Sequence, residues 1–327
     1  IAKYTGLDAT ALIGGDVAQL GGNAICGKGK FVIAEADESD GSFLKFHPHI
    51  AVITNIENDH LDYYGTEEKL YGAFKKYLSN IKAGGMAILC TDNPQVEKLS
   101  REISVPVITY GIDNGRYRAH NIRYDKNGTK YDLSVDGNYV AEIHLQVPGR
   151  HNVQNSVGAF AVADAMGIEK NKIVEALASF CGAKRRFETK AKINDMWFVD
   201  DYAHHPTEIK AVLAAAKQTG MNRIIVCFQP HRYTRFQNLW CDFMDSFEGS
   251  DALFVTDVYS AGDSPIKNVT SKRFVGELSE LKKNTFLTSE EAFPKDVSQF
   301  VHAGDTILCL NAGSLSKHIP ELLEVIK

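Results

Sequence analysis

The sequence has no run of eighteen apolar residues, no CxxC pair and no excess of positive charge. The first absence argues against a transmembrane helix, and no signal peptide opens the chain. The net charge of −5, from 36 basic and 41 acidic residues, argues against a dedicated nucleic-acid-binding protein. Six scattered cysteines, several of them in strand-like runs, are typical of buried thiols in a reducing cytosol. We expect a cytoplasmic protein without nucleic-acid or membrane partners.

The sequence also lacks an initiator Met and the dinucleotide fingerprint GxGxxG. It opens at Ile1–Tyr4, which we interpret as the tail of a helix that ends at Gly6, so we expect a piece of something longer. The 327 residues are enough for two domains, each with its own core. Hydrophobic and charged fractions of 44% and 24% are those of an ordinary globular protein.

Apolar runs alternate with helical patterns, which predicts an α/β fold built on parallel, doubly wound sheets. Buried strands are predicted at 31–34, 50–54, 86–90, 196–199, 223–228, 252–256 and 306–310. An apolar run at 11–13 leads into a predicted turn at Gly14-Gly15. Thr66 is placed to cap a helix that ends near Gly84. Between 105 and 147 an Asn127-Gly128 turn predicts a small antiparallel β insert.

Two polar clusters follow predicted strands in the first half. The run from Glu35 to Asp40 follows the first strand, and Asp59-His60 follows the next. An acidic run is more often a solvated loop, and a single histidine is more often structural. Adjacent strands that bring Glu35 and His60 to one sheet edge would form a site for a hard cation such as Mg²⁺. We therefore predict that these two residues share a metal ion.

Two further motifs lie near the middle of the chain. Asn152 and Asn155 fall in the first turn of an alanine-rich helix, where backbone N–H groups favour a phosphate or nucleotide, or where an Asn simply caps the helix. Arg185 and Arg186 follow a glycine at an expected domain junction. They form either a solvated linker or a phosphate clamp.

The chain is organised around Asp200-Asp201-Tyr202-Ala203-His204-His205-Pro206-Thr207-Glu208, which joins a predicted strand to a predicted helix. One Asp-His pair there would be interpreted as a helix cap. Two carboxylates, two imidazoles and a phenol on one turn instead predict a ligand site, because ligands bind at the carboxyl ends of parallel strands. Arg232 and Arg235 follow the next strand and are suited to a substrate carboxylate.

Together these motifs resemble the Mur ligases of bacterial peptidoglycan synthesis over essentially the whole chain. The resemblance is carried by 35–40, 54–60, 148–152 with Asn155, 185–187, 200–208 and Phe228-Gln229-Pro230-His231-Arg232-Tyr233-Thr234-Arg235. The last two motifs match the alanine-adding branch better than the tripeptide-recycling branch. The resemblance implies an α/β fold with a truncated P-loop-type central domain at 1–186, carrying the small antiparallel insert. A Rossmann-like C-terminal ligase domain would follow at 187–327.

The resemblance also implies a reaction. ATP would phosphorylate the lactyl carboxylate of UDP-N-acetylmuramic acid, and the amine of L-alanine would then attack the acyl phosphate. Phosphoryl transfer of this kind needs cations and positioning more than covalent help. By the same resemblance, Glu35 and His60 would ligate Mg²⁺ or Mn²⁺, and Asn152 and Asn155 would hold the adenine.

The remaining roles implied by the resemblance fall to Arg186, at the end of the first domain, and to residues of the second domain. Arg186 would bind a phosphate, and domain closure would bring Asp201 and His204 to the ATP phosphates and metal. The catalytic and substrate-orienting residues that offset developing charge would be Tyr202, His205, His231, Arg232 and Arg235.

One departure limits this interpretation. The family has an N-terminal UDP-binding domain and a GxxxxGK[ST] loop, and neither occurs in this sequence. Without the backbone cradle of that loop, we expect the polypeptide by itself not to be a competent ligase. Two other functional classes stay open: a non-catalytic binding fragment, and a metal-dependent hydrolase that uses Glu35, Asp37 and His60.

Overall fold

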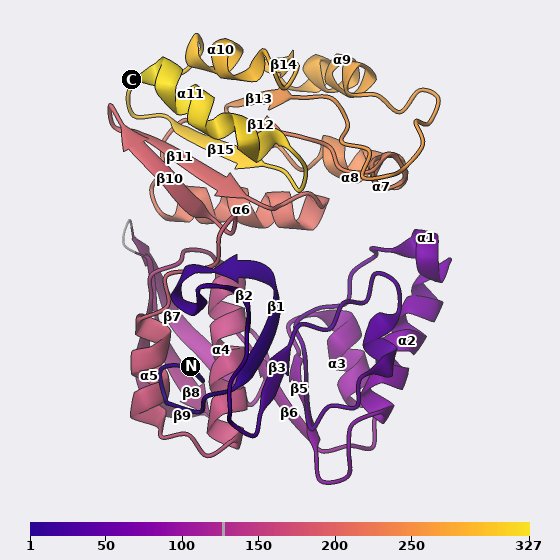
Figure 1. Cartoon of the computed structure of the whole chain (residues 1–327), viewed down its shortest axis with the longest axis vertical. Coiled ribbons are helices and arrows are strands. Elements are labelled where there is room, and N and C mark those ends of the chain that lie inside the picture. Colours follow the sequence, from indigo (N-terminus) through magenta and orange to yellow (C-terminus); the bar gives the residue numbers. More distant parts are fainter. Residues whose placement is uncertain (126–127) are drawn as a thin grey trace. The chain divides into compact units, whose positions relative to one another are not determined.

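The computed structural model describes residues 1–125 and 128–327, and it divides into two compact units (Figure 1). The first is Ile1–Cys181 and the second is Gly182–Lys327. The division falls before Arg185, whereas the sequence suggested a boundary after Arg186. The physical reason is that the Arg185 guanidinium donates hydrogen bonds to Asn311, deep in the second unit.

The main sheet of the first unit has six strands in the order β4-β5-β6-β7-β8-β9. Their bounds are β4 Ile50–Ile53, β5 Met86–Cys90, β6 Val107–Gly111, β7 Tyr117–Asp125, β8 Gly128–Val135 and β9 Asn138–Leu145. Strands β4 to β7 pair in parallel, and β7 to β9 form an antiparallel meander. The predicted antiparallel insert therefore extends the main sheet. The turn predicted at Asn127 lies outside the described residues.

Helices cover both faces of this sheet, as Figure 1 shows. Successive residues of β5 point to opposite faces, so that Leu89 packs with α2 and α3 while Ile88 packs with α4 and α5. The helices are α1 Leu61–Tyr64, α2 Glu67–Ser79, α3 Pro94–Ser100, α4 Arg150–Ala165 and α5 Lys170–Ala178, with 3-10 turn η2 at Ser42–Lys45. The predicted cap is confirmed, since Thr66 Oγ1 accepts from the Lys69 N–H, but α2 ends at Ser79 rather than near Gly84.

Three strands form a separate small sheet in the order β2-β1-β3, and within the described residues they do not pair with strands of the main sheet. Its strands are β1 Thr10–Val17, β2 Gly22–Ile25 and β3 Val32–Ala34, with 3-10 turn η1 at Ala18–Leu20. Two sequence predictions are wrong here. The strand β1 runs through the glycines that were predicted to turn. Strand β3 is exposed, with Val32 at 66%, because it is an edge strand in a small sheet.

The sheet of the second unit has the order β10-β11-β15-β12-β13-β14. Its strands are β10 Glu188–Ile193, β11 Met196–Asp201, β12 Ile224–Phe228, β13 Ala252–Val255, β14 Thr285–Leu287 and β15 Thr306–Leu310. All pair in parallel except β10, which forms an antiparallel hairpin with β11. The sequence predicted β11, β12, β13 and β15 and missed the two edge strands. Asn194 and Asp195 form the two-residue hairpin turn. Both have positive φ, as a type I′ turn requires of its two central residues.

Helices also cover both faces of the second sheet. They are α6 Pro206–Gln218, α7 Tyr233–Asn238, α8 Trp240–Met244, α9 Ser271–Leu281, α10 Phe293–Ser298 and α11 Ile319–Ile326, with 3-10 turn η3 at Leu315–His318. Phe228 packs with α6 to α9, whereas its neighbour Cys227 packs with α10 and α11. Completely burying a side chain such as Phe236 contributes about 1.5–3 kcal/mol. In the described chain no helix is both long enough and apolar enough to span a bilayer.

The cysteines divide evenly by burial. Cys90, Cys227 and Cys309 are buried in strands, and none of the six is in a disulfide. Burial raises the pKa of the Cys90 thiol to about 11, so that this group stays protonated and inert near neutral pH. The expectation of buried strand thiols is confirmed for these three residues.

Candidate active site

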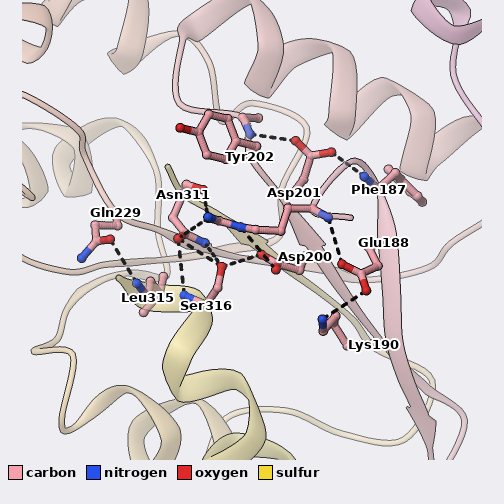
Figure 2. Close-up of polar contacts among 12 residues, drawn as sticks. Phe187, Glu188, Lys190, Asp200, Asp201, Tyr202, Gln229, Asn311, Leu315 and Ser316 are labelled. Carbon is pink, nitrogen blue, oxygen red and sulfur yellow. Dashed lines mark hydrogen bonds and ion pairs between the residues drawn. The ribbon is translucent and has the colours of Figure 1, made fainter. Parts of the chain in front are cut away.

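Asp200 and Asp201 form the end of β11, which is two residues longer than predicted, and both are buried. The two oxygens of Asp201 accept backbone N–H groups from Phe187 at 2.6 Å and Ala203 at 2.7 Å (Figure 2). Burial raises the pKa of Asp201 to about 6, although these two hydrogen bonds act in the opposite direction. The Asp201 carboxylate therefore fixes the main chain just before β10, at Phe187, and just after β11, at Ala203.

The turn that follows begins α6 as the sequence predicted. Pro206 is the first helical residue, and Glu208 accepts from the N–H groups of His204 at 2.9 Å and His205 at 3.2 Å. Burial raises the pKa of Glu208, but the neighbouring His204 and Arg186 lower it by more. His205 and Glu208 therefore cap the helix, whereas the simpler interpretation of the sequence assigned the cap to an Asp–His pair.

The other side chains of the turn have different surroundings. His204 Nδ1 lies 2.8 Å from the carbonyl oxygen of Tyr202, which can only accept, so Nδ1 carries a proton. In the neutral imidazole Nε2 is then the basic nitrogen. The Tyr202 ring lies 4.9 Å from the Arg185 guanidinium and 5.4 Å from that of Arg186. The turn thus combines a base, a phenol and two cations.

The adjacent arginines separate into two roles. Arg185 is hydrogen-bonded to Asn311, and its Nε lies 3.6 Å from Asp200 Oδ2. Arg186 is 57% exposed, and its Nη1 lies 3.7 Å from Glu208 Oε1. Arg185 is therefore neither a solvated linker residue nor an open phosphate clamp, and Arg186 is the more accessible cation.

A line of rings joins the ends of three strands. The ring centroids of His204 and His231 are 5.4 Å apart, and His231 stacks on Tyr259 at 5.6 Å. Tyr259 was not among the predicted site residues, although it lies in the polar segment after β13. Burial, His204 and the flanking arginines lower the pKa of His231 to about 4, so its imidazole is neutral at pH 7.

Arg232 and Arg235 have partners within the second unit. Arg235 Nη1 lies 3.2 Å from His231 Nδ1, and because a guanidinium only donates, His231 carries its proton on Nε2. Arg232 has φ 67°, and its Nε lies 3.5 Å from Asp263 Oδ1. Thr234 also donates to Asp263. The positive φ of a bulky residue is a local strain of the kind that clusters at functional sites.

In the first unit His60 lies among carboxylates. Its Nε2 is 3.6 Å from Glu38 Oε1 and 3.5 Å from Asp59 Oδ2. Burial raises the pKa of Glu38. Glu35 Oε2 instead accepts the Gly14 N–H at 2.6 Å. Contrary to the sequence prediction, β3 and β4 are in different sheets, so Glu35 and His60 do not follow neighbouring strands.

The donor groups around His60 are an imidazole and carboxylates, which are possible ligands of a divalent cation. Among residues 1–125 and 128–327 no group of three or more His, Cys, Asp or Glu side chains is arranged to hold a metal ion. Mg²⁺ commonly takes only one or two protein ligands and completes its shell with phosphate oxygens and water. An imidazole beside carboxylates fits such a sparse site, and it suits Mn²⁺ as well.

The start of α4 carries the two predicted amide residues. Gly149 is the N-cap, with φ 104°, and no side chain caps this helix. Asn152 Nδ2 donates to the Pro148 carbonyl at 2.6 Å, and Asn155 is exposed. The alternative of a simple Asn cap is therefore wrong, and the ligand-binding role of Asn152 and Asn155 stays a prediction.

Comparisons with known proteins identify the class. Residues 23–163 match the Mur ligase middle domain, and residues 185–313 match the Mur ligase glutamate ligase domain. The chain therefore belongs to the Mur ligase family, as the sequence motifs implied. Within that family, it is 40% identical over 331 residues to the UDP-N-acetylmuramate–L-alanine ligase of Pelotomaculum thermopropionicum, covering 100% of this chain and 72% of the relative.

Two further relatives agree. The enzyme of the same name from Endomicrobium trichonymphae is 43% identical over 98% of this chain and 71% of its own length. The crystal structure of UDP-N-acetylmuramate-alanine ligase from Thermotoga maritima superposes with a TM-score of 0.83 at 28% identity. That match covers 99% of this chain and 70% of the crystallised one. The two-unit α/β fold is the fold of these ligases.

Proposed function

We propose that this chain supplies the central and C-terminal domains of an ATP-dependent ligase that joins L-alanine to UDP-N-acetylmuramic acid in peptidoglycan synthesis, in the bacterial cytoplasm. The observation that carries the proposal is about 40% identity over the whole chain to ligases of that name. The clustering of Tyr202, His204, His231 and Arg186 at the carboxyl ends of β11 and β12 supports it.

The proposed reaction has two steps. A carboxylate oxygen of the lactyl group attacks the γ-phosphorus of ATP, and ADP leaves, which gives an acyl phosphate. The neutral amine of L-alanine then attacks the acyl carbon, and the tetrahedral intermediate expels phosphate as the amide forms. The amine nitrogen must lose a proton, and negative charge develops on the acyl oxygen, so the site needs both a base and hydrogen-bond donors.

The first unit is proposed to bind the nucleotide. α4 begins at Arg150, so Asn155 lies exposed in its second turn rather than the predicted first turn, and Asn152 orders the preceding loop through Pro148. Together they would hold the adenine. Glu35 and His60 would hold the metal ion, which supplies positive charge beside the transferred phosphoryl group. Glu38 is an additional carboxylate neighbour of His60.

The second unit is proposed to supply cations and proton carriers. Arg186, the exposed member of its pair, would bind a phosphate, and Asp201 and His204 would complete the ATP site. His204 also presents the basic Nε2 that can take a proton from the amine. His231 presents an Nε2–H donor that can stabilise the developing oxyanion, since its Nδ1 accepts from Arg235.

The acceptor is proposed to lie among the remaining polar residues of this edge. L-Alanine carries a carboxylate, which suits the guanidinium groups of Arg232 and Arg235. Tyr202 and His205 flank the same turn and would orient the amine. The hydrolase alternative is weaker, because a metal site that works without nucleotide oxygens needs more protein ligands, and among residues 1–125 and 128–327 no group of three or more His, Cys, Asp or Glu side chains is arranged to hold a metal ion.

The test is phosphate release with ATP and Mg²⁺, measured with UDP-N-acetylmuramic acid and L-alanine added separately and together. The ligase predicts release, with an amide product by mass spectrometry, only when both are present. Release with neither would support the hydrolase, and binding without turnover would support the binding fragment. Residues 1–327 and the chain extended upstream of Ile1 by a UDP-binding domain and a GxxxxGK[ST] segment are assayed side by side, which also checks the prediction that residues 1–327 alone are inactive.

A further inference from the structure

Asp200 is a buried carboxylate to which no role has been assigned. It is 1% exposed at the end of β11, beside the more prominent Asp201. Ser316 Oγ donates to its Oδ1 at 2.8 Å (Figure 2). Arg185 Nε lies 3.6 Å from its Oδ2. A buried charge is costly unless it is paired and hydrogen-bonded, so these two partners are what keep Asp200 in place.

Arg185 is fixed from a second direction. Its Nη2 donates to the carbonyl oxygen of Asn311 at 2.5 Å and to the Oδ1 of the same residue at 2.8 Å. Asn311 is fully buried, and its Nδ2 donates to Ser316 Oγ at 3.0 Å. Four side chains from three segments thus form one connected network, which we call the Arg185 network: Arg185, Asp200, Asn311 and Ser316.

The network acts on Tyr202. The guanidinium of Arg185 lies 4.9 Å from the ring centroid of Tyr202, at a distance typical of a cation–π contact. The Tyr202 N–H also donates to the Arg185 carbonyl oxygen at 2.7 Å. The planar guanidinium donates two hydrogen bonds through Nη2 and forms an ion pair with Asp200 at 3.6 Å, so it restricts where the ring can lie.

We propose that the Arg185 network is a positioning device, in which Asp200, Asn311 and Ser316 hold Arg185 against Tyr202 and so set Tyr202 for the L-alanine site. This inference rests on the proposed function, in which Tyr202 orients the acceptor. The two adjacent arginines then have different functions. Arg185 positions the Tyr202 ring, and the exposed Arg186 binds a phosphate.

The competing explanation is that the network only stabilises the fold. The chain offers a matched control at the amino end of the same sheet. Arg223 Nη1 lies 2.7 Å from Oδ2 of the buried Asp305, and its guanidinium lies 4.8 Å from the Phe300 ring. This second Arg–Asp–aromatic set has the same chemistry as the first and is far from every proposed site residue along the strands.

The kinetic test compares Asp200→Asn, Arg185→Lys and Arg223→Lys in the enzyme assayed above. We expect the first two to raise the KM for L-alanine about tenfold, with the KM for ATP changed by less than about twofold, as for loss of one charge-assisted contact. Arg223→Lys is expected to lower Tm without changing either KM. The proposal is overturned if the KM for L-alanine is unchanged in both network variants while Tm falls as in the control.

A second measurement does not depend on activity. In protein with ¹³C-labelled tyrosine rings, the Tyr202 signal is identified by its loss in Tyr202→Phe. We expect that signal to shift in Asp200→Asn and Arg185→Lys and to stay in place in Arg223→Lys. An unmoved Tyr202 signal in both network variants contradicts the proposal. Absence of alanine-dependent turnover in the unsubstituted enzyme would instead refute the proposed function, and the ring signals would still decide on the positioning.

Discussion

The carboxylate of Asp201 accepts the backbone N–H of Phe187 at 2.6 Å, so the last residue of β11 holds the residue that precedes β10. Phe187 lies at φ 51°, in the left-handed region that a bulky residue rarely adopts. This contact fixes the main chain directly after Arg186. Asp201 was predicted only to bind a ligand. It therefore also has a structural role, because it fixes the backbone beside Arg186.

The first prediction concerns the titration of Asp201. Burial raises its pKa from 3.8 to about 6, so the folded protein binds the proton more tightly than the unfolded chain does. Its contribution to stability is present below pH 4 and is lost as the pH rises through 6, by on the order of 3 kcal/mol. We expect the free energy of unfolding of the unsubstituted protein, minus that of Asp201→Asn, to fall by this amount between pH 4 and pH 7. Urea unfolding measures it, and a constant difference would contradict the assignment.

The second prediction concerns His231 and has the opposite sign. Burial and the nearby cations lower its pKa from 6.5 to about 4, so the unfolded chain binds the proton more tightly. Its contribution to stability is present above pH 6.5 and is lost as the pH falls to 4. The unfolding free energy relative to His231→Gln should therefore decrease on acidification from pH 7 to pH 4. A difference that rises over this range would show that His231 is charged in the folded protein.

The third prediction concerns the metal ion. His60→Ala should weaken Mn²⁺ binding about tenfold or more, because a ligand beside Glu38 and Asp59 is removed. Mn²⁺ titration followed by electron paramagnetic resonance, with and without ATP, measures the affinity. His144→Ala is the matched control, since the His144 Nε2 lies 2.6 Å from Glu142 Oε1 and belongs to no proposed site. Equal affinities for the two variants would remove His60 from the site.

The fourth prediction separates affinity from stability at Arg186. Its side chain is 57% exposed, so Arg186→Gln should leave Tm nearly unchanged. Loss of a charge-assisted phosphate contact should raise the KM for ATP about tenfold. Arg101→Gln, which removes an arginine with 75% exposure and a local partner in Glu97, is the control and should change neither quantity. A fall in Tm specific to Arg186→Gln would indicate a structural role instead.

The sequence predicted the fold best where burial is complete. β12 and β15 are apolar on both faces, and such runs are recognisable without knowledge of the partners. β10 was missed because it is a half-exposed edge strand, and its alternating Lys190 and Lys192 resemble a solvated segment. The exposure of Val32 could not be predicted either. β3 is apolar like a buried strand, and its residues do not indicate whether other elements pack over them.

The candidate site was predicted in its composition and less well in its contacts. The Asp200–Glu208 stretch, His231 and Arg235 were selected because polar residues at strand ends lie at a shared edge. The proximity of Asn311 to Arg185 depends on the strand order, in which β15 pairs with β11, and that of Tyr259 to His231 depends on the pairing of β12 with β13. Sequence spacing does not contain that order, so these partners emerge only from the structure.

The most direct test of the proposed ligase follows one oxygen atom. UDP-N-acetylmuramic acid labelled with ¹⁸O in its lactyl carboxylate is incubated with ATP, Mg²⁺ and L-alanine, and the released phosphate is analysed by mass spectrometry. With both carboxylate oxygens labelled, an acyl phosphate intermediate predicts one ¹⁸O atom in each released phosphate and one ¹⁸O atom retained in the carbonyl of each amide. Phosphate that carries no ¹⁸O, and that takes its new oxygen from water, would contradict the account and leave hydrolysis in its place.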